Sequence, residues 1–148
     1  MKIMKIMKIM KITILLAIIL IFTTKLLVAE DFSITFANKY SMDGAVQTPL
    51  GVIKAITIKG VFSDSRGYTG VINCLGTSGK NLDFVCDATD EDGDMFYSSG
   101  KRIDNGGEVI MTGGTGKYAN IISKCEYQIA SFSSEVMVGL ITMQCSNN

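Results

Sequence analysis

Two groups of residues in this 148-residue chain have types that carry chemistry: four cysteines and a run of clustered carboxylates. The cysteines are Cys74, Cys86, Cys125 and Cys145. Thiolates hold soft metals, take part in redox exchange, or pair as disulfides. The chain contains no C-x-x-C pair and no zinc-type spacing, which disfavours the metal and redox alternatives. An even number of cysteines favours disulfides, for which three pairings exist.

The phase of the cysteines along their strands narrows the choice of pairing. A disulfide requires both Cβ atoms on the same face of a sheet. Cys74 and Cys86 flank one expected loop, and Cys125 and Cys145 flank one expected turn. Cys86, Cys125 and Cys145 each share a phase with apolar neighbours. The sequence therefore favours the pairs Cys74–Cys86 and Cys125–Cys145 over the other two connectivities.

The carboxylates cluster in Asp87–Asp94, where they could supply the oxygen ligands that Ca²⁺ prefers. The EF-hand template does not fit, because its first and last ligand positions fall on Ala88 and Ser99. We favour a solvated β-turn, in which aspartate and glycine supply the turn geometry. The alternative is a calcium site of another type, and no other metal or cofactor is expected. The ligands of that alternative site would be Asp90, Asp92 and Asp94.

The absence of histidine excludes several kinds of site. Ser-His-Asp and Cys-His hydrolysis, histidine zinc sites and histidine-ligated haem all require it. The glycine-rich segment Gly113–Lys117 is superficially similar to a phosphate-binding loop. It fails the spacing, because Met111 stands at the first glycine position and Tyr118 follows Lys117. We interpret this segment as a tight turn with positive φ angles.

The N-terminal 29 residues have the order of a secretion signal: a lysine-rich start, the apolar stretch Ile12–Phe22, and a small residue at Ala29. A membrane anchor is the alternative, but a spanning helix needs about 20 apolar residues. We predict a signal peptide at residues 1–29 and one domain at residues 30–148, with no membrane span after cleavage. Export to the periplasm or the extracellular space places the cysteines in an oxidising compartment.

The charge of the mature chain excludes a further class of protein. Signal cleavage removes five of the 14 basic residues, so nine remain against 14 acidic ones, a net charge of about −5. Nucleic-acid binding needs a basic surface, so we expect no nucleic-acid partner. A net negative charge also argues against docking on anionic lipid.

The mature chain reads as short alternating runs separated by glycine-rich or polar turns, one of them at Asp43–Gly44. This pattern predicts an all-β protein, a single eight-stranded antiparallel β-barrel. An immunoglobulin-like sandwich is the alternative, but the core tryptophan typical of that fold is missing. The expected strands are Phe32–Phe36, Val52–Phe62, Tyr68–Leu75, Leu82–Cys86, Met95–Ile103, Glu108–Thr112, Tyr118–Ala130 and Val136–Cys145.

Two segments carry a family resemblance. Thr112–Tyr127 resembles the G-x-G-K-[FY]-x-G-[IV]-x-G segment of allene oxide cyclase-like and dirigent-like barrels, in particular uncharacterised exported bacterial members. Cys86–Asp94 resembles the Asp-Gly-Asp stretch before a strand in such proteins. Asn120 and Ser123 stand where glycines are usual. The resemblance covers about the C-terminal half of the chain and implies an eight-stranded barrel. No catalytic residue of these cyclases or coupling proteins can be matched here.

Three functions remain, and the sequence leaves the oligomeric state open. We rank first an exported, non-enzymatic barrel that binds a small apolar or amphipathic molecule, although ordinary core packing also explains its candidate lining residues. A structural or surface-interaction protein without ligand ranks second. A cyclase or isomerase with Glu126 or Glu108 as its base ranks third, and Glu126 is expected to face solvent. The candidate lining residues are Phe32, Phe36, Phe62, Phe84, Phe96 and Tyr127.

Overall fold

The computed structural model describes residues 31–147, so the predicted signal peptide lies outside the described residues. These residues form eight strands and one short 3-10 helix, η1. The elements are β1 (Phe32–Thr48), β2 (Gly51–Asp64), β3 (Thr69–Ser78), β4 (Leu82–Asp90), β5 (Met95–Ile103), β6 (Gly106–Gly114), η1 (Gly116–Tyr118), β7 (Ile122–Ser133) and β8 (Val138–Asn147).

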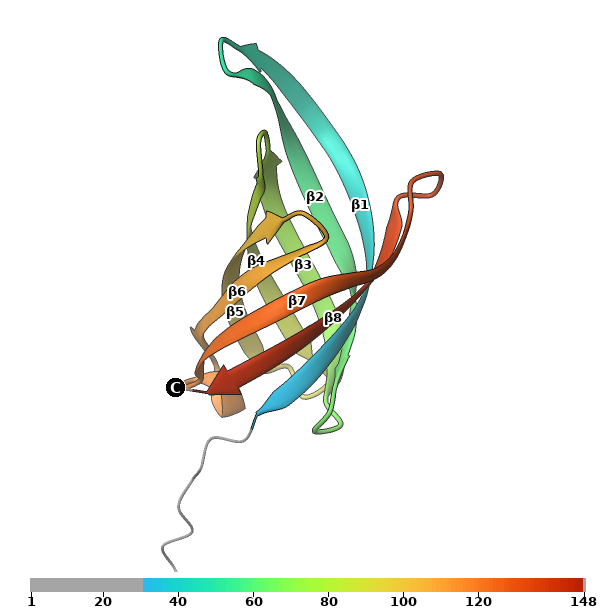
Figure 1. The fold of residues 1–148 in the computed structure, drawn as a ribbon. Coiled ribbons are helices and arrows are strands. Elements are labelled where there is room, and N and C mark those ends of the chain that lie inside the picture. The colour runs from blue at the N-terminus through green and yellow to red at the C-terminus, as the bar shows by residue number, and fades with distance from the viewer. Residues whose placement is uncertain (1–30, 148) are drawn as a thin grey trace, which may run out of the picture.

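The strands form a closed barrel in which each is paired with its neighbours in sequence order (Figure 1). Every pairing is antiparallel, and β1 closes the barrel by pairing with β8 from Phe32↔Cys145 to Lys39↔Val138. The predicted eight-stranded antiparallel barrel is confirmed, and the sandwich alternative is wrong. Closure removes most of the free sheet edge that an open sandwich would expose. Across residues 31–147 no helix has the length and apolar character needed to cross a membrane.

The barrel interior is filled by the apolar phase of each strand. Phe32, Ile34 and Phe36 alternate along β1 and are all buried. The ring of Phe62 lies 6.2 Å from that of Phe36 and 5.4 Å from that of Phe96, centroid to centroid. Such tilted and edge-on contacts are the arrangements that aromatic pairs prefer. Side chains alone therefore occupy most of an eight-stranded interior.

Both predicted disulfides are present. Cys74 pairs with Cys86 and Cys125 with Cys145, each with a Cα–Cα distance of 4.0 Å. In both cases the two cysteines are direct cross-strand partners, one pair on β3 and β4 and the other on β7 and β8. All four side chains are buried in the core. Two disulfides in one small domain indicate an oxidising, non-cytoplasmic environment.

Two local predictions were wrong. Asp43–Gly44 does not form a turn, because β1 continues to Thr48 and accommodates this site as a shift in register between Met42 and Gly44. Asp43 accepts hydrogen bonds from the hydroxyls of Ser41 and Thr57, so its side chain is used within the sheet.

Tyr118 does not begin a strand. It lies in η1, and β7 starts only at Ile122. Gly113, where β6 shifts register against β5, and Gly116, at the start of η1, have φ angles of 98° and 47°, which regular extended backbone does not have. The chain leaves β6 through this positive-φ segment, so the glycine-rich turn predicted there is present.

The two ends of the barrel differ. The end that we call lower contains the β2–β3 and β4–β5 turns, η1 and the start of β1. The upper end contains the other four hairpin connections. There the β1–β2 hairpin extends past the rest of the barrel, as the cyan-to-green ribbon in Figure 1 shows.

Candidate functional site

The lower end is organised by the buried carboxylate of Asp90, at the end of β4. Its Oδ1 accepts the backbone N–H groups of Asp92 and Asp94, both at 3.0 Å. The backbone closes the same turn, because Asp90 N–H donates to the carbonyl of Asp94 and Gly93 N–H donates to that of Asp90, both at 3.0 Å. The φ angle of Gly93 is 84°, which explains the glycine.

The β2–β3 turn repeats this arrangement around Asp64. Asp64 Oδ1 accepts the backbone N–H groups of Arg66 and Tyr68 at 2.9 and 3.0 Å. Gly67 N–H donates to the carbonyl of Asp64 at 3.1 Å, and the φ angle of Gly67 is 94°. Both turns therefore follow one local pattern, D-x-x-G-x. Glu91 joins them, because its Oε2 accepts the backbone N–H of Thr69 at 2.6 Å.

Lys117 of η1 lies against the β4–β5 turn. Its Nζ is 2.8 Å from Oδ2 of Asp90 and 2.6 Å from Oδ2 of Asp92. The Asp90 side chain is fully buried at 0% exposure, whereas Asp92 is 65% exposed. The backbone N–H of Lys117 donates to Oδ2 of Asp94 at 3.1 Å. Gly116 has to be glycine, because a Cβ there would lie 1.9 Å from Oδ1 of Asp94.

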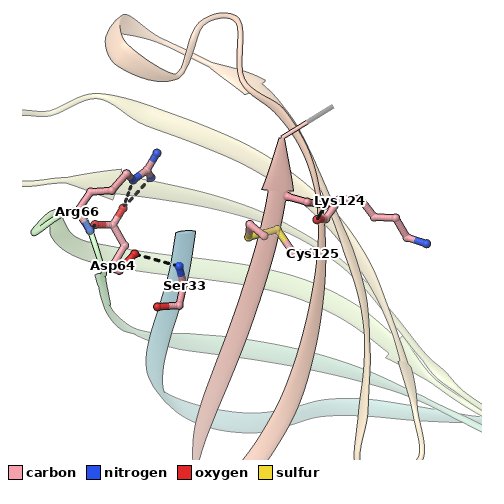
Figure 2. Close-up of a disulfide and its surroundings, with 8 residues drawn as sticks. Ser33, Asp64, Arg66, Lys124 and Cys125 are labelled. Carbon is pink, nitrogen blue, oxygen red and sulfur yellow. Dashed lines mark hydrogen bonds and ion pairs between the residues drawn. A yellow bond between two sulfur atoms is a disulfide. The ribbon is translucent and has the colours of Figure 1, made fainter. Parts of the chain in front are cut away.

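Aromatic rings complete the closure of the lower end. The Lys117 ammonium lies 4.1 Å from the centroid of the Tyr68 ring. Arg66, paired with Asp64 at 2.6 Å, lies 3.8 Å above the ring of Phe32. Figure 2 shows the Asp64–Arg66 pair beside Ser33 at the start of β1, near the Cys125 disulfide. Buried Tyr118 packs 5.2 Å from the ring of Phe96. Cations over ring faces and buried ion pairs together seal this end.

The charges at this end shift the pKa values of their neighbours. Burial raises the pKa of Asp90, but hydrogen bonds from Lys117, Tyr118 and two backbone amides outweigh it, so the pKa lies below its usual value. The contact with Asp90, followed by that with Asp92, raises the pKa of Lys117. Burial, with a smaller contribution from Asp90, raises the pKa of Tyr118. Asp90 and Lys117 are therefore both charged over the neutral range.

This geometry bears directly on the calcium alternative. The cation between Asp90 and Asp92 is the Lys117 ammonium, and the third proposed ligand, Asp94, accepts the Lys117 backbone N–H. Among residues 31–147 no three side chains of the histidine, cysteine, aspartate or glutamate types are grouped so as to hold a metal. The carboxylates are arranged as a turn with its own counterion.

The upper end, by contrast, is hollow. A cavity of about 420 Å³ opens between the finger-like β1–β2 hairpin and the other upper connections. Its apolar lining includes Tyr40, Leu82 and Phe132, and the Tyr40 and Phe132 rings meet edge-on at 5.6 Å. Its charged lining consists of Lys54, Lys80, Arg102 and Asp104.

A small void of about 50 Å³ lies deeper in the barrel, and Tyr40 borders both this void and the upper cavity. Asn38 lines the void and is only 6% exposed, yet its Oδ1 has no hydrogen-bond donor. Its cross-strand neighbours are Gly60 and Gly139, and a Cβ on Gly60 would lie 2.1 Å from Oδ1 of Asn38. Gly60 thus leaves space for a polar side chain inside an apolar barrel, whereas a Cβ on Gly139 would lie 3.2 Å from the Phe132 and Tyr40 rings.

Tyr40 and Tyr127 both line this void. Burial raises the pKa of Tyr127 to about 12, against a smaller lowering effect of Arg102. Burial also raises the pKa of Tyr40, against lowering effects of an Asn38 hydrogen bond and of Arg102. Both phenols stay protonated at neutral pH and can act as hydrogen-bond donors.

The aromatic residues that the sequence proposed as ligand-lining have two locations. Phe36, Phe84, Phe96 and Tyr127 surround the small void, whereas Phe32 and Phe62 are packed in the core away from it. None of the six lines the upper cavity. The larger space is formed instead by residues at the upper strand ends.

The proposed catalytic bases are not inside the barrel. Glu108 and Glu126 are cross-strand partners on β6 and β7, and both are exposed on the outer surface. Glu108 forms an ion pair with Lys124 at 3.1 Å. The expectation that Glu126 faces solvent is confirmed, and the hypothesis of a buried base at either position is wrong.

Asn38, Tyr40 and Arg102 were not predicted from the sequence. The signal for Asn38 was available, because it continues the inward phase of Phe32, Ile34 and Phe36 as a polar residue. Lys117 was considered only as part of a phosphate loop. The sequence predicted turns at Asp64–Gly67 and Asp90–Asp94, and both are present, but the lysine that pairs with Asp90 is 27 positions away and could not be assigned from spacing.

No protein-family model matches this chain, and a search of curated proteins finds no significant match. The functional conclusion therefore rests on the geometry of the site itself.

Proposed function

We propose that this chain is an exported barrel protein that binds one small amphipathic molecule at its upper end. The observation that carries the proposal is the Oδ1 atom of Asn38, a buried acceptor without a donor in the small void, which shares Tyr40 with the upper cavity. Leaving such an atom unpaired costs about 1–3 kcal/mol. A ligand hydroxyl or amine that reached Asn38 would recover that free energy.

The size and lining of the two spaces define the class of ligand. Sites for small molecules are mostly apolar clefts of roughly 300–1,000 Å³ with a few polar groups, and the upper cavity, at about 420 Å³, falls within that range. The void beside Asn38 is only about 50 Å³, so it accepts no more than a small group. The apolar body of the ligand would lie against Tyr40 and Phe132, with any anionic group towards Lys54, Lys80 and Arg102.

Other features support the exported, non-enzymatic part of the proposal. The two disulfides and the lysine-rich, apolar N-terminal sequence suit a periplasmic or extracellular protein. The barrel topology agrees with a distant relationship to the allene oxide cyclase-like and dirigent-like barrels. With Glu108 and Glu126 on the outer surface, no acid–base pair is proposed. A purely structural barrel is the second candidate, favoured by the small volume of the inner void.

Native mass spectrometry of the mature, unreduced protein tests the proposal first. A retained small molecule supports binding and identifies its chemical class. Titration with 1-anilinonaphthalene-8-sulfonate then uses a probe with an apolar body and one anionic group. We expect Asn38→Leu to weaken its binding at least tenfold, because the variant fills the void and removes the acceptor.

Asn73→Leu is the matched control, because Asn73 is exposed on the outer face of β3. This variant should bind the probe as the unmodified protein does. Two results together would favour the structural barrel. The first is equal affinity of the unmodified chain and Asn38→Leu for the probe, and the second is a native mass spectrum that shows no bound small molecule.

A further inference from the structure

The β1–β2 hairpin contains a projecting segment that the barrel does not need for closure. We call residues 44–53 the finger. β1 pairs with β8 only as far as Lys39, and β2 pairs with β3 only from Lys54. From Val46↔Ile53 to Thr48↔Gly51 the finger is therefore a two-stranded ribbon held only by its own pairing. A ribbon of this kind is only marginally stable in water without a further contact.

The finger has no charged residue and exposes apolar side chains on both of its faces. Val46 and Ile53 are cross-strand partners that share one face, and they are 65% and 42% exposed. Val52, 44% exposed, is adjacent to Ile53 and so points to the other face. Leu50, in the turn, is 99% exposed. A protein partner would cover one face of the ribbon, whereas a lipid surface can surround both.

Charge is distributed unevenly between the two ends of the barrel. The lower turns contain the acidic residues Asp64, Asp90, Glu91, Asp92 and Asp94. The upper cavity, beside the finger, is lined by three basic residues and one acidic residue. Asp43 and Glu135 add negative charge around the upper connections, so the basic lining of the cavity, and not the upper end as a whole, is what would attract an anionic surface.

From these three features we infer that the finger inserts into the interface of an anionic lipid bilayer, with the upper end of the barrel facing the membrane. Insertion is shallow, because the edge of β1 beyond Tyr40 has no strand partner other than β2. Unpaired backbone groups are not tolerated in the hydrocarbon region. The turn and its apolar side chains enter the interface, while Lys54, Lys80 and Arg102 lie near the headgroups.

The absence of tryptophan from this chain allows a direct test with a single introduced fluorophore. Leu50→Trp places the reporter at the tip of the finger, and Leu75→Trp is the matched control on the side wall, where Leu75 is 60% exposed. Vesicles of equal parts phosphatidylcholine and phosphatidylglycerol are added to each mature variant. We expect a blue shift and quenching by brominated lipid for Leu50→Trp only.

Other outcomes would overturn the inference. Unchanged emission of Leu50→Trp with vesicles, or equal shifts at both positions, would exclude insertion through the finger. A blue shift that appears without vesicles and grows with protein concentration would assign the finger to contact with a second copy of the chain.

A second variant separates binding from folding. Leu50→Asp should reduce cosedimentation with the same vesicles at least tenfold and leave the melting temperature unchanged, because Leu50 is almost fully exposed. Undiminished cosedimentation would contradict the inference. Asn38→Leu should bind vesicles as the unmodified chain does, so failure of the ligand proposal and failure of this inference are distinguishable.

Discussion

Removing the carboxylate of Asp90 tests how the lower end is held together. Asp90→Ala deprives two backbone N–H groups of their acceptor and the Lys117 ammonium of its buried counterion. Each lost hydrogen bond to a charged group is worth about 1.5–3 kcal/mol, and breaking a buried ion pair costs about 3–5 kcal/mol. Because these contributions overlap, we expect the free energy of unfolding to fall by about 3–5 kcal/mol.

The assay is thermal unfolding of the oxidised mature domain, followed by circular dichroism at neutral pH. For a domain of this size, 1 kcal/mol corresponds to roughly 4 °C, so the melting temperature should fall by roughly 12–20 °C. Asp92→Ala is the matched control. It removes the other carboxylate from Lys117, but that side chain is 65% exposed, and an exposed ion pair contributes only about 0–1 kcal/mol.

The pH dependence follows from the lowered pKa of Asp90. In the unfolded chain the pKa of an aspartate is about 3.9. The stabilisation from the ionised carboxylate is therefore complete above that pH and is lost as the pH falls through the lower, folded-state pKa. Asp90→Asn should reduce this acid sensitivity.

Two results would refute this account of the acidic turn. The first is a melting temperature of Asp90→Ala within a few degrees of that of the unmodified chain. The second is a rise in the melting temperature of the unmodified chain on addition of calcium, which would show that the carboxylates bind a metal ion in preference to Lys117.

Three further predictions concern the glycine segment, the disulfides and the interior tyrosine. Gly116→Ala should lower the melting temperature clearly, because its Cβ would collide with Asp94 at a φ of 47°, whereas Gly44→Ala, with open space around it, should not. The two disulfides close loops with separations of 12 and 20 residues, so each should contribute about 3 kcal/mol. Because their sulfurs are buried, dithiothreitol should add four hydrogens, seen by mass spectrometry, only after denaturant is added; reduction of the native protein would contradict this. Stability should fall as the pH rises from about 10 towards the Tyr127 pKa of about 12, because the unfolded phenol ionises first, and Tyr127→Phe should reduce that loss.

The sequence determined the features that depend on local pattern. Alternation of apolar and polar residues predicted eight strands, and their length and spacing predicted antiparallel closure. The phase of the cysteines predicted both disulfides, because cross-strand partners of hairpin strands have to share a face. The D-x-x-G-x turns also depend on nearby residues, since each aspartate binds amides two and four positions ahead.

The tertiary structure alone decided the features that depend on register and on residues far apart in the chain. It brought Lys117 to Asp90. It also placed Asn38 of β1 between Gly60 of β2 and Gly139 of β8, because β1 pairs with both of these strands. It extended β1 through Asp43–Gly44, because pairing with β2 outweighed a local preference to turn. It also decided which end of the barrel is sealed by charge and aromatic rings and which end is open. The alternation of residues along the sequence specifies whether a side chain points into the barrel or out of it. Which other side chains it meets there depends on the register of all eight strands.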